Sequence, residues 1–269
     1  MTVAPITAVV TGASQGLGLA IAQELASRGV RVMLAAPNPD TLAKAAATIP
    51  GAAHLITDVR DPAQTQALAD ATIARFGQID IWLNNAGQAL TGDSLLTLPP
   101  ETLDRMIDIN LKGALYGCQA AARAMARTMT SGSIWNMLGA GADNQPVPKM
   151  NGYATSKAAL TFLTRALAGE APPHLAFAAL SPGLVLTEGF FRENAKSQLP
   201  PEARAARDAV VNILADTPQT LATWAADIML GVCENGSIHT WLTPEKIAAR
   251  QQESPPRDVL TLARAAQNR

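Results

Sequence analysis

The chain has 269 residues, a formal net charge of −1, and a composition that is 48% hydrophobic and 16% charged. This length fits one large α/β domain, and the apolar share excludes a mainly disordered chain. The nearly neutral charge argues against a nucleic-acid partner, which would need a basic surface. The sequence has no run of 18 apolar residues and no basic leader, so we expect a soluble, cytoplasmic protein without a transmembrane segment.

Short apolar, β-branched runs alternate with longer helical patterns. The predicted strands are Ile6–Val10, Val30–Ala36, His54–Thr57, Ile79–Leu83, Ser133–Met137, Leu175–Leu180 and, as a seventh, Ser237–Leu242. The predicted helices lie around 16–29, 39–48, 62–76, 101–129 and 153–170. This alternation predicts an α/β fold over a single domain, residues 1–269. The expected architecture is a Rossmann-type, doubly wound, mostly parallel sheet of about seven strands, with helices on both faces.

The region 184–217 departs from this alternation and follows the sixth strand. Ligands of doubly wound folds lie outside the carboxyl ends of the strands, so this region is a candidate substrate-side lid. The alternative is a surface segment that packs on a neighbouring subunit. The tail 251–269 is expected to fray or to form a short helix. The cysteines and histidines are scattered without ligand spacing, so we expect reduced thiols and no metal site.

A glycine-rich segment, Thr11–Gly18, directly follows the first predicted strand and opens a helix. Glycines there allow a tight turn and a close approach of the backbone to a pyrophosphate, which the N–H groups of the helix N-terminus then face. A purely structural turn is the alternative. The cofactor-binding candidates in this segment are Gly12, Ser14, Gln15, Gly16, Leu17 and Gly18.

The choice between the two nicotinamide dinucleotides is expected at the end of the second strand. That strand ends with Ala36, Pro37 and Asn38, without the carboxylate that would accept from a ribose diol, and also without an arginine. We therefore expect NADP(H) to be slightly preferred over NAD(H), with Asn38 near the phosphate. After the third strand, Asp58 and Val59 are candidates for the adenine site; the alternative for Asp58 is a helix cap.

Tyr153 and Lys157 lie four residues apart at the start of a predicted helix, and therefore on one face of it. An ammonium group near a phenol favours the phenolate, so we expect Lys157 to lower the pKa of Tyr153. Such a tyrosine exchanges a proton with a carbinol oxygen near neutral pH. A surface pair is the alternative when this spacing is considered alone.

Five segments occur in one order: Thr11–Gly18, Asn84–Gly87, Asn110–Gly113, Tyr153–Lys157 and Ser181–Thr187. In order and spacing they resemble the short-chain dehydrogenase/reductase family, over residues 5–190 most strongly. The resemblance implies a nicotinamide-dependent oxidoreductase that reduces a carbonyl or oxidises an alcohol, and a homodimer or homotetramer. It implies catalytic roles for Tyr153, Lys157 and Asn110, and further cofactor contacts from Asn85, Ala86, Gly87, Tyr153, Lys157, Pro182, Gly183, Val185 and Thr187.

Two of these residues also have structural alternatives. Asn110, which the resemblance places in a proton relay through water, is alternatively a satisfied buried amide that pins its helix. Thr187, which the resemblance places at the nicotinamide carboxamide, is alternatively a helix N-cap with Glu188 in the first turn.

One feature of the family pattern is missing. The family usually carries a serine about 13 residues before the tyrosine, but no hydroxyl residue lies between Ser133 and Tyr153. Asp143, Asn144 or a backbone N–H is expected to replace it, or the substrate does not need it, or catalysis is weak. The last case supports an alternative function, a nicotinamide-nucleotide-binding sensor or scaffold with little turnover.

The segments Ile134–Gly141, Ser181–Thr187 and Trp241–Pro244 resemble the chlorophyll(ide) b reductases. That resemblance implies reduction of a formyl group on a large apolar ring, in an open cleft. Arg192 or Lys196 is a candidate partner for a propionate. The other substrate-side candidates are Gly139, Ala140, Asp143, Leu184, Phe190 and Phe191.

Overall fold

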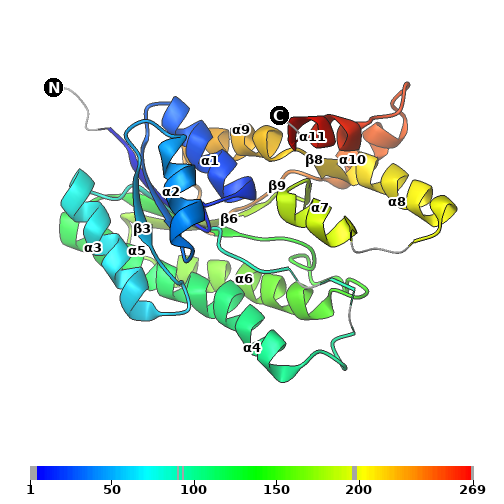
Figure 1. The fold of residues 1–269 in the computed structure, drawn as a ribbon. Coiled ribbons are helices and arrows are strands. Elements are labelled where there is room, and N and C mark those ends of the chain that lie inside the picture. The colour runs from blue at the N-terminus through cyan, green and yellow to red at the C-terminus, as the bar shows by residue number, and fades with distance from the viewer. Residues whose placement is uncertain (1–4, 90, 93, 196–198, 268–269) are drawn as a thin grey trace.

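We describe residues 5–89, 91–92, 94–195 and 199–267 of a computed structural model. Seven strands form one parallel sheet in the order β3-β2-β1-β4-β5-β6-β9, as predicted (Figure 1). The strand order reverses between β1 and β4, which creates the crevice where doubly wound folds bind ligands. The strands are β1 (Thr7–Thr11), β2 (Arg31–Ala36), β3 (Ala53–Ile56), β4 (Ile81–Asn84), β5 (Gly132–Met137), β6 (Leu175–Ser181) and β9 (Ile238–Thr240).

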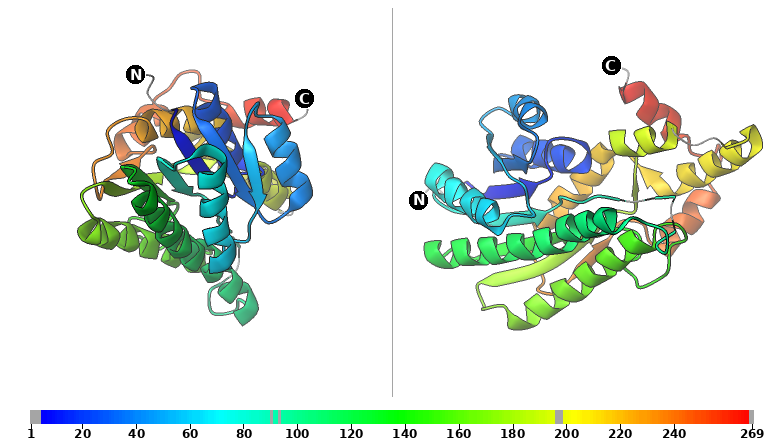
Figure 2. Two further views of the ribbon diagram at one scale, coloured as in Figure 1. Left: turned by 90° about the vertical axis from the view of Figure 1, so that its left-hand side faces the viewer. Right: turned by 60° about the horizontal axis from the view of Figure 1, so that its bottom comes forward.

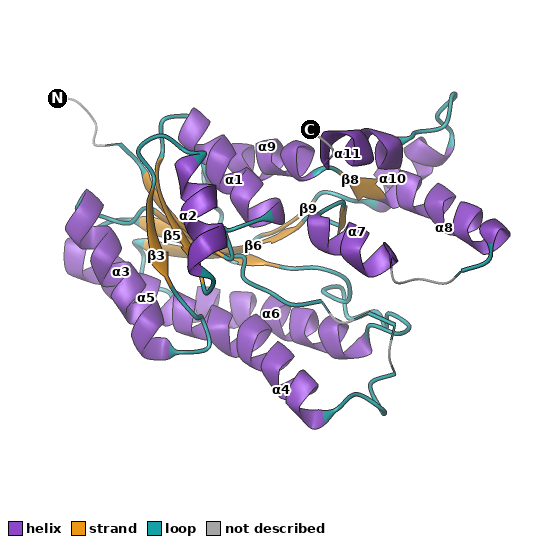
Figure 3. Cartoon of the chain, in the orientation of Figure 1, coloured by secondary structure: helices purple, strands orange, loops and turns teal. Residues whose placement is uncertain are grey.

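Helices cover both faces of this sheet (Figure 3). One face carries α1 (Gly16–Ser27), α2 (Pro39–Ala47) and α9 (Pro218–Met229). The other carries α3 (Pro62–Phe76), α5 (Gly113–Thr128) and α6 (Asn151–Glu170). The strands β1 and β4, with all their residues buried, lie between the two helical layers.

The predicted helix 101–129 is divided in the structure. It consists of α4 (Pro100–Ile107), one π-helical turn (Asp108–Lys112) and α5. Asn110 lies in this turn, fully buried, and its side chain bonds to Gln88 and Ser156 on other elements. Such turns occur often at functional sites, and periodicity alone does not reveal them.

The region 184–217 contains β7 (Leu184–Val185), α7 (Glu188–Ala195), α8 (Pro201–Leu214) and β8 (Ala215–Asp216). β7 and β8 pair in parallel as a small second sheet. Near α8, α10 (Pro244–Gln251) and α11 (Val259–Gln267) complete this end of the chain, so the tail does form a helix (Figure 2). None of the helices that the structure describes is long and apolar enough to cross a membrane.

Candidate active site

A cleft of about 2350 Å³ opens at the carboxyl ends of the strands. It contains every predicted cofactor-binding residue and most predicted substrate-side residues. Two candidates lie outside its lining. Asn110 is fully buried behind it, and Phe191 packs against the apolar cluster formed by Leu186, Val211, Ala215, Val259, Leu260 and Ala263. The ring of Phe191 packs against this cluster, so in this structure Phe190, and not Phe191, lines the cleft.

The glycine-rich turn after β1 is shaped as a cradle. Gly12 and Gly16 have φ angles of 65° and 58°, which side chains rarely adopt. A Cβ on Gly12 would lie 2.8 Å from the Cα of Ala86, and one on Gly18 would overlap the amide of Asn85. The turn and the loop after β4 are thus in direct backbone contact, which only glycine permits.

The N-terminus of α1 points into this cradle without a side-chain cap. Gln15, the N-cap residue, makes no capping hydrogen bond. The first amides of a helix carry a partial positive charge and need acceptors. An uncapped helix start beside a glycine turn fits a pyrophosphate, so the residues present suit a dinucleotide.

Tyr153 and Lys157 stand on the cleft side of α6, which begins at Asn151, two residues before the predicted start. Burial raises the pKa of Tyr153 to about 12 and lowers the pKa of Lys157 to about 8. Lys157 Nζ donates to the carbonyl oxygen of Met137 at 2.8 Å and lies 5.5 Å from the centre of the Tyr153 ring. The expectation that Lys157 lowers the pKa of Tyr153 is therefore wrong for this geometry, in which burial of the phenol dominates.

Asn110 joins the loop after β4 to the helix that carries Tyr153. Its Oδ1 accepts from the backbone N–H of Gln88 at 2.7 Å, and its Nδ2 donates to Gln88 O and to Ser156 Oγ, both at 3.0 Å. These three bonds partner the side-chain amide and tie the π-helical turn to α6 and to the loop after β4. Gly87 lies near both the Asn110 amide and the Lys157 ammonium group. A Cβ on Gly87 would be 3.4 Å from Asn110 Oδ1 and 3.6 Å from Lys157 Nζ.

The adenosine end of the cleft contains an arginine that the sequence interpretation overlooked. Arg60 Nη2 lies 2.5 Å from Asp58 Oδ2, and this guanidinium lowers the pKa of Asp58. Asp58 does not cap α3, because Asp61 does so through the N–H of Ala63. Asn38 caps α2 at Thr41 N while also lining the cleft. Arg60 could have been found from the sequence, because it stands two residues after Asp58, which was already a candidate for the adenine site.

Thr187 closes the cleft above the glycine-rich turn. Its Oγ1 accepts from the N–H of Phe190 at 3.3 Å at the start of α7, so the N-cap alternative is realised. A Cβ on Gly16 would lie 3.2 Å from the methyl group of Thr187. The region 184–217 and the glycine-rich turn therefore meet at these two residues.

The segment where the family serine is expected forms a tight turn. Ala142 N donates to Gly139 O at 3.1 Å, and Gly141 has a φ angle of 88°. A Cβ on Gly139 would overlap the Tyr153 hydroxyl. The side chain of Asp143 bonds to Gln145 N instead. The turn thus brings main chain, and no hydroxyl side chain, beside Tyr153.

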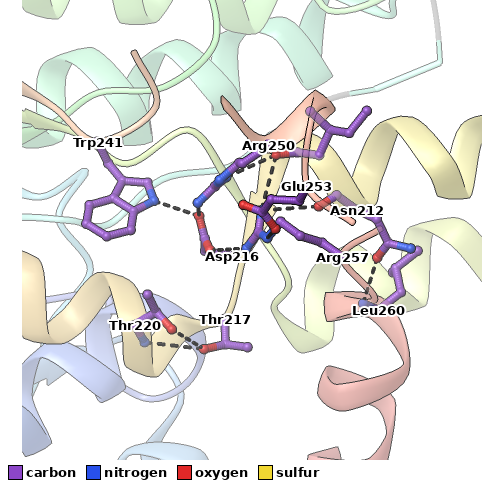
Figure 4. Close-up of polar contacts among 10 residues, drawn as sticks. Asn212, Asp216, Thr217, Thr220, Trp241, Arg250, Glu253, Arg257 and Leu260 are labelled. Carbon is purple, nitrogen blue, oxygen red and sulfur yellow. Dashed lines mark hydrogen bonds and ion pairs between the residues drawn. The ribbon is translucent and has the colours of Figure 1, made fainter. Parts of the chain in front are cut away.

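A buried carboxylate, Asp216, lies on β8 at the end of the 184–217 region. Asp216 accepts from Trp241 Nε1 and Arg250 Nη2, both at 2.6 Å, and from Arg257 Nη2 at 2.8 Å (Figure 4). Its own carbonyl oxygen accepts from Leu186 N. Within the late Trp241–Pro244 motif, Trp241 therefore bonds to β8, and Leu242 lines the cleft. Arg192 lines the cleft as well, whereas Lys196 lies outside the described residues.

A parallel doubly wound sheet with a glycine cradle and a Tyr–Lys pair in one cleft defines a nicotinamide-dependent oxidoreductase. The short chain dehydrogenase family model matches residues 6–198, and the chain belongs to this family. It is an NAD(P)-dependent dehydrogenase/reductase. This membership favours the enzyme over the sensor or scaffold alternative.

Similar proteins include the chloroplastic chlorophyll(ide) b reductase NOL of Oryza sativa subsp. japonica, 30% identical over 197 residues. The match covers 69% of this chain and 57% of the rice protein. The 3beta-hydroxysteroid dehydrogenase 1 of Eggerthella lenta is 34% identical, over 82% of this chain and 85% of its own. A solved actinorhodin polyketide ketoreductase with NADPH superposes with a TM-score of 0.79 at 26% identity, over 88% of this chain and 95% of its own.

Proposed function

We propose that this protein reduces a formyl or keto group on a large, apolar ring substrate, with Tyr153 as proton donor. The observation that carries the proposal is the position of Tyr153 in the cleft that also contains the glycine cradle. With a pKa raised to about 12, the phenol is protonated at neutral pH. A carbonyl oxygen whose carbon has accepted a hydride is basic enough to take this proton. When bound, the nicotinamide supplies the hydride for the carbonyl carbon.

The remaining site residues bind and orient. The turn after β1, with Gly12, Gly16 and Gly18, holds the pyrophosphate at the start of α1. Lys157, a single turn of α6 beyond Tyr153, holds the ribose. Asn110 acts through Gln88 and Ser156 by keeping the loop after β4 and α6 in register. Further cofactor contacts come from Asn85, Ala86, Gly87, Pro182, Gly183, Val185 and Thr187.

The substrate side of the cleft supports a wide, flat ring. Leu184, Phe190, Leu242 and Met150 line it, and the Gly139–Gly141 turn adds no bulky side chain. Arg192 lines the same cleft and has no ion pair with any residue that the structure describes. A formyl-bearing chlorin with a free carboxylate would supply an anion that pairs with Arg192, and the rice relative is a chlorophyll(ide) b reductase.

NADPH is the proposed cofactor. The residues that line the cleft at and directly after the end of β2 are Ala36, Pro37, Asn38 and Thr41, none of them a carboxylate, and Arg60, paired with Asp58, lies in the same cleft. A carboxylate at that place would repel a 2′-phosphate, and its absence removes that obstacle. We further propose a homodimer or homotetramer in the cytoplasm, built from one domain over 1–269.

The test is cofactor consumption by purified protein over a carbonyl panel with NADPH and NADH. The panel contains a formyl-bearing chlorin with a free carboxylate, its methyl ester, and small aromatic aldehydes and ketones. We expect turnover of the chlorin with NADPH, loss of that turnover in Tyr153→Phe by about 100-fold or more, and unchanged NADPH binding.

Arg192→Gln separates binding from chemistry in the same assay. It should raise KM for the carboxylated chlorin and leave KM for the ester unchanged. NADPH binding without turnover of any carbonyl would contradict the proposal and restore the sensor alternative. Turnover of small carbonyls alone would reject the ring substrate while keeping the reductase.

A further inference from the structure

The turn at Gly139–Ala142 places unused backbone donors beside the proton-donating tyrosine. The amide hydrogens of Gly139, Ala140 and Gly141 donate to no acceptor within residues 5–89, 91–92, 94–195 and 199–267. All three residues line the cleft, but Gly141 is buried and packs against Ala154, whereas Gly139 and Ala140 keep exposed surface. The first two amides are therefore the ones that a ligand in the cleft can reach.

This turn is held firmly to the helix that carries the tyrosine. Thr161 Oγ1, two turns after Tyr153 on α6, donates to Ala142 O at 2.9 Å. A Cβ on Gly141 would overlap Ala154, and one on Gly139 would overlap the Tyr153 hydroxyl. The amides and the phenol are thus fixed relative to each other, as a preorganised pair of donors requires.

We propose that the backbone N–H groups of Gly139 and Ala140 donate to the substrate carbonyl oxygen, in place of the serine hydroxyl that the family uses. The oxygen gains negative charge as its carbon accepts the hydride, and Tyr153 then supplies the proton that completes the alcohol. Backbone amides aimed at that charge stabilise it without any reorganisation. A glycine at position 139 allows the backbone to lie this close to Tyr153, because a Cβ there would overlap the tyrosine hydroxyl.

This inference rests on the proposed carbonyl reduction. Two variants of the turn test it, and the first places a proline at position 140. Gly141, with φ of 88°, occupies the third position of a type II turn, whose second position favours proline. The chain contains the same turn with proline in that place: Ala52 N donates to Ile49 O at 3.1 Å, and Gly51 has φ of 78° after Pro50. Ala140→Pro therefore removes one amide hydrogen within a backbone that accepts proline.

A second variant removes the other donor. Replacing Gly139 by glycolic acid turns its amide into an ester, which deletes the N–H without adding a Cβ beside Tyr153. We expect at least one variant to lose about 100-fold in kcat, the effect typical of one lost oxyanion donor. NADPH affinity and the melting temperature should match the wild type in both. Pro50→Ala, at the equivalent turn outside the cleft, is the control and should keep wild-type turnover.

The outcomes separate the two proposals. If the wild type reduces the chlorin and both turn variants do so within threefold of it, the backbone donors are not used and the inference is overturned alone. If the wild type reduces no carbonyl, the proposed function fails together with it. A loss confined to the ester variant assigns the donor role to Gly139, and a loss confined to Ala140→Pro assigns it to Ala140.

Discussion

The main chain of Gly139 packs directly against the hydroxyl of Tyr153, which stands 14 positions later on α6. No side chain fits between them. The position of the Tyr153 hydroxyl therefore depends on the missing Cβ of Gly139, which lies just after the end of β5. Small changes in this contact should affect the chemical step more than substrate binding.

Gly139→Ala should lower kcat by about 100-fold, because the added methyl group displaces the hydroxyl from the carbonyl oxygen. NADPH affinity, measured by fluorescence titration, should remain close to wild type. Gly169→Ala is the matched control on α6, since a Cβ there meets no atom within 4 Å. Equal kcat values in the two variants would remove the Gly139–Tyr153 contact from the catalytic geometry.

Gly18→Ala should weaken NADPH binding by about tenfold or more, equivalent to ~1.4 kcal/mol. A Cβ at Gly18 would overlap Asn85 Nδ2, so the loop after β4 must move away from the phosphate cradle. Titration of the variant with NADPH measures the change. A variant that binds NADPH like the wild type would show that the loop can shift without affecting the cofactor.

Lys157 should impose a pH dependence on stability. Its ordinary pKa of 10.5 falls to about 8 in the folded chain, because the ammonium is buried. Between these values the unfolded chain binds more protons, so this residue makes the free energy of unfolding rise with pH, by at most about 1.4 kcal/mol per pH unit. Below pH 8 both states are protonated and the contribution is constant.

Urea unfolding of wild type and Lys157→Met from pH 7 to pH 10 isolates this effect, since other groups cancel in the difference. We expect the free-energy advantage of the variant to shrink as pH rises through 8. A difference independent of pH would mean that the lysine keeps its ordinary pKa.

Asp216→Asn should destabilise the chain by about 3–5 kcal/mol, because two guanidiniums would lose their buried anion. Asp70→Asn is the control: Asp70 and Arg127 are each about half exposed, and exposed pairs contribute at most ~1 kcal/mol. Urea unfolding compares the two variants. Similar losses in the free energy of unfolding would show that the Asp216 cluster contributes no more than an exposed ion pair.

The same variant tests whether the cluster supports the lid. Asp216 joins the C-terminal segment through its carboxylate and Leu186 through its carbonyl oxygen. Hydrogen exchange should therefore speed up at the amides of 184–187 in Asp216→Asn, while those of β1 remain protected. Unchanged exchange at 184–187 would separate the cluster from the lid.

Much of the fold follows from local pattern. Apolar runs alternating with helices predicted all seven strands of the sheet, and the glycine spacing after β1 predicted the tight turn that opens α1. Helix α9 was missed, although Thr217 caps it and Pro218 opens it, because its apolar face of small alanines gives a weak signal. Its burial against α1 becomes visible only when the two helices are packed together.

The sequence by itself determined the parallel sheet and the residue types of the site, because strand and helix periods and the i,i+4 spacing of Tyr153 and Lys157 are local properties. Only the tertiary structure decided the protonation of that pair, the contact at Gly139 and the Asp216 cluster. These depend on burial and on groups brought together from distant parts of the chain. Such terms arise from packing, and no spacing along the chain encodes them.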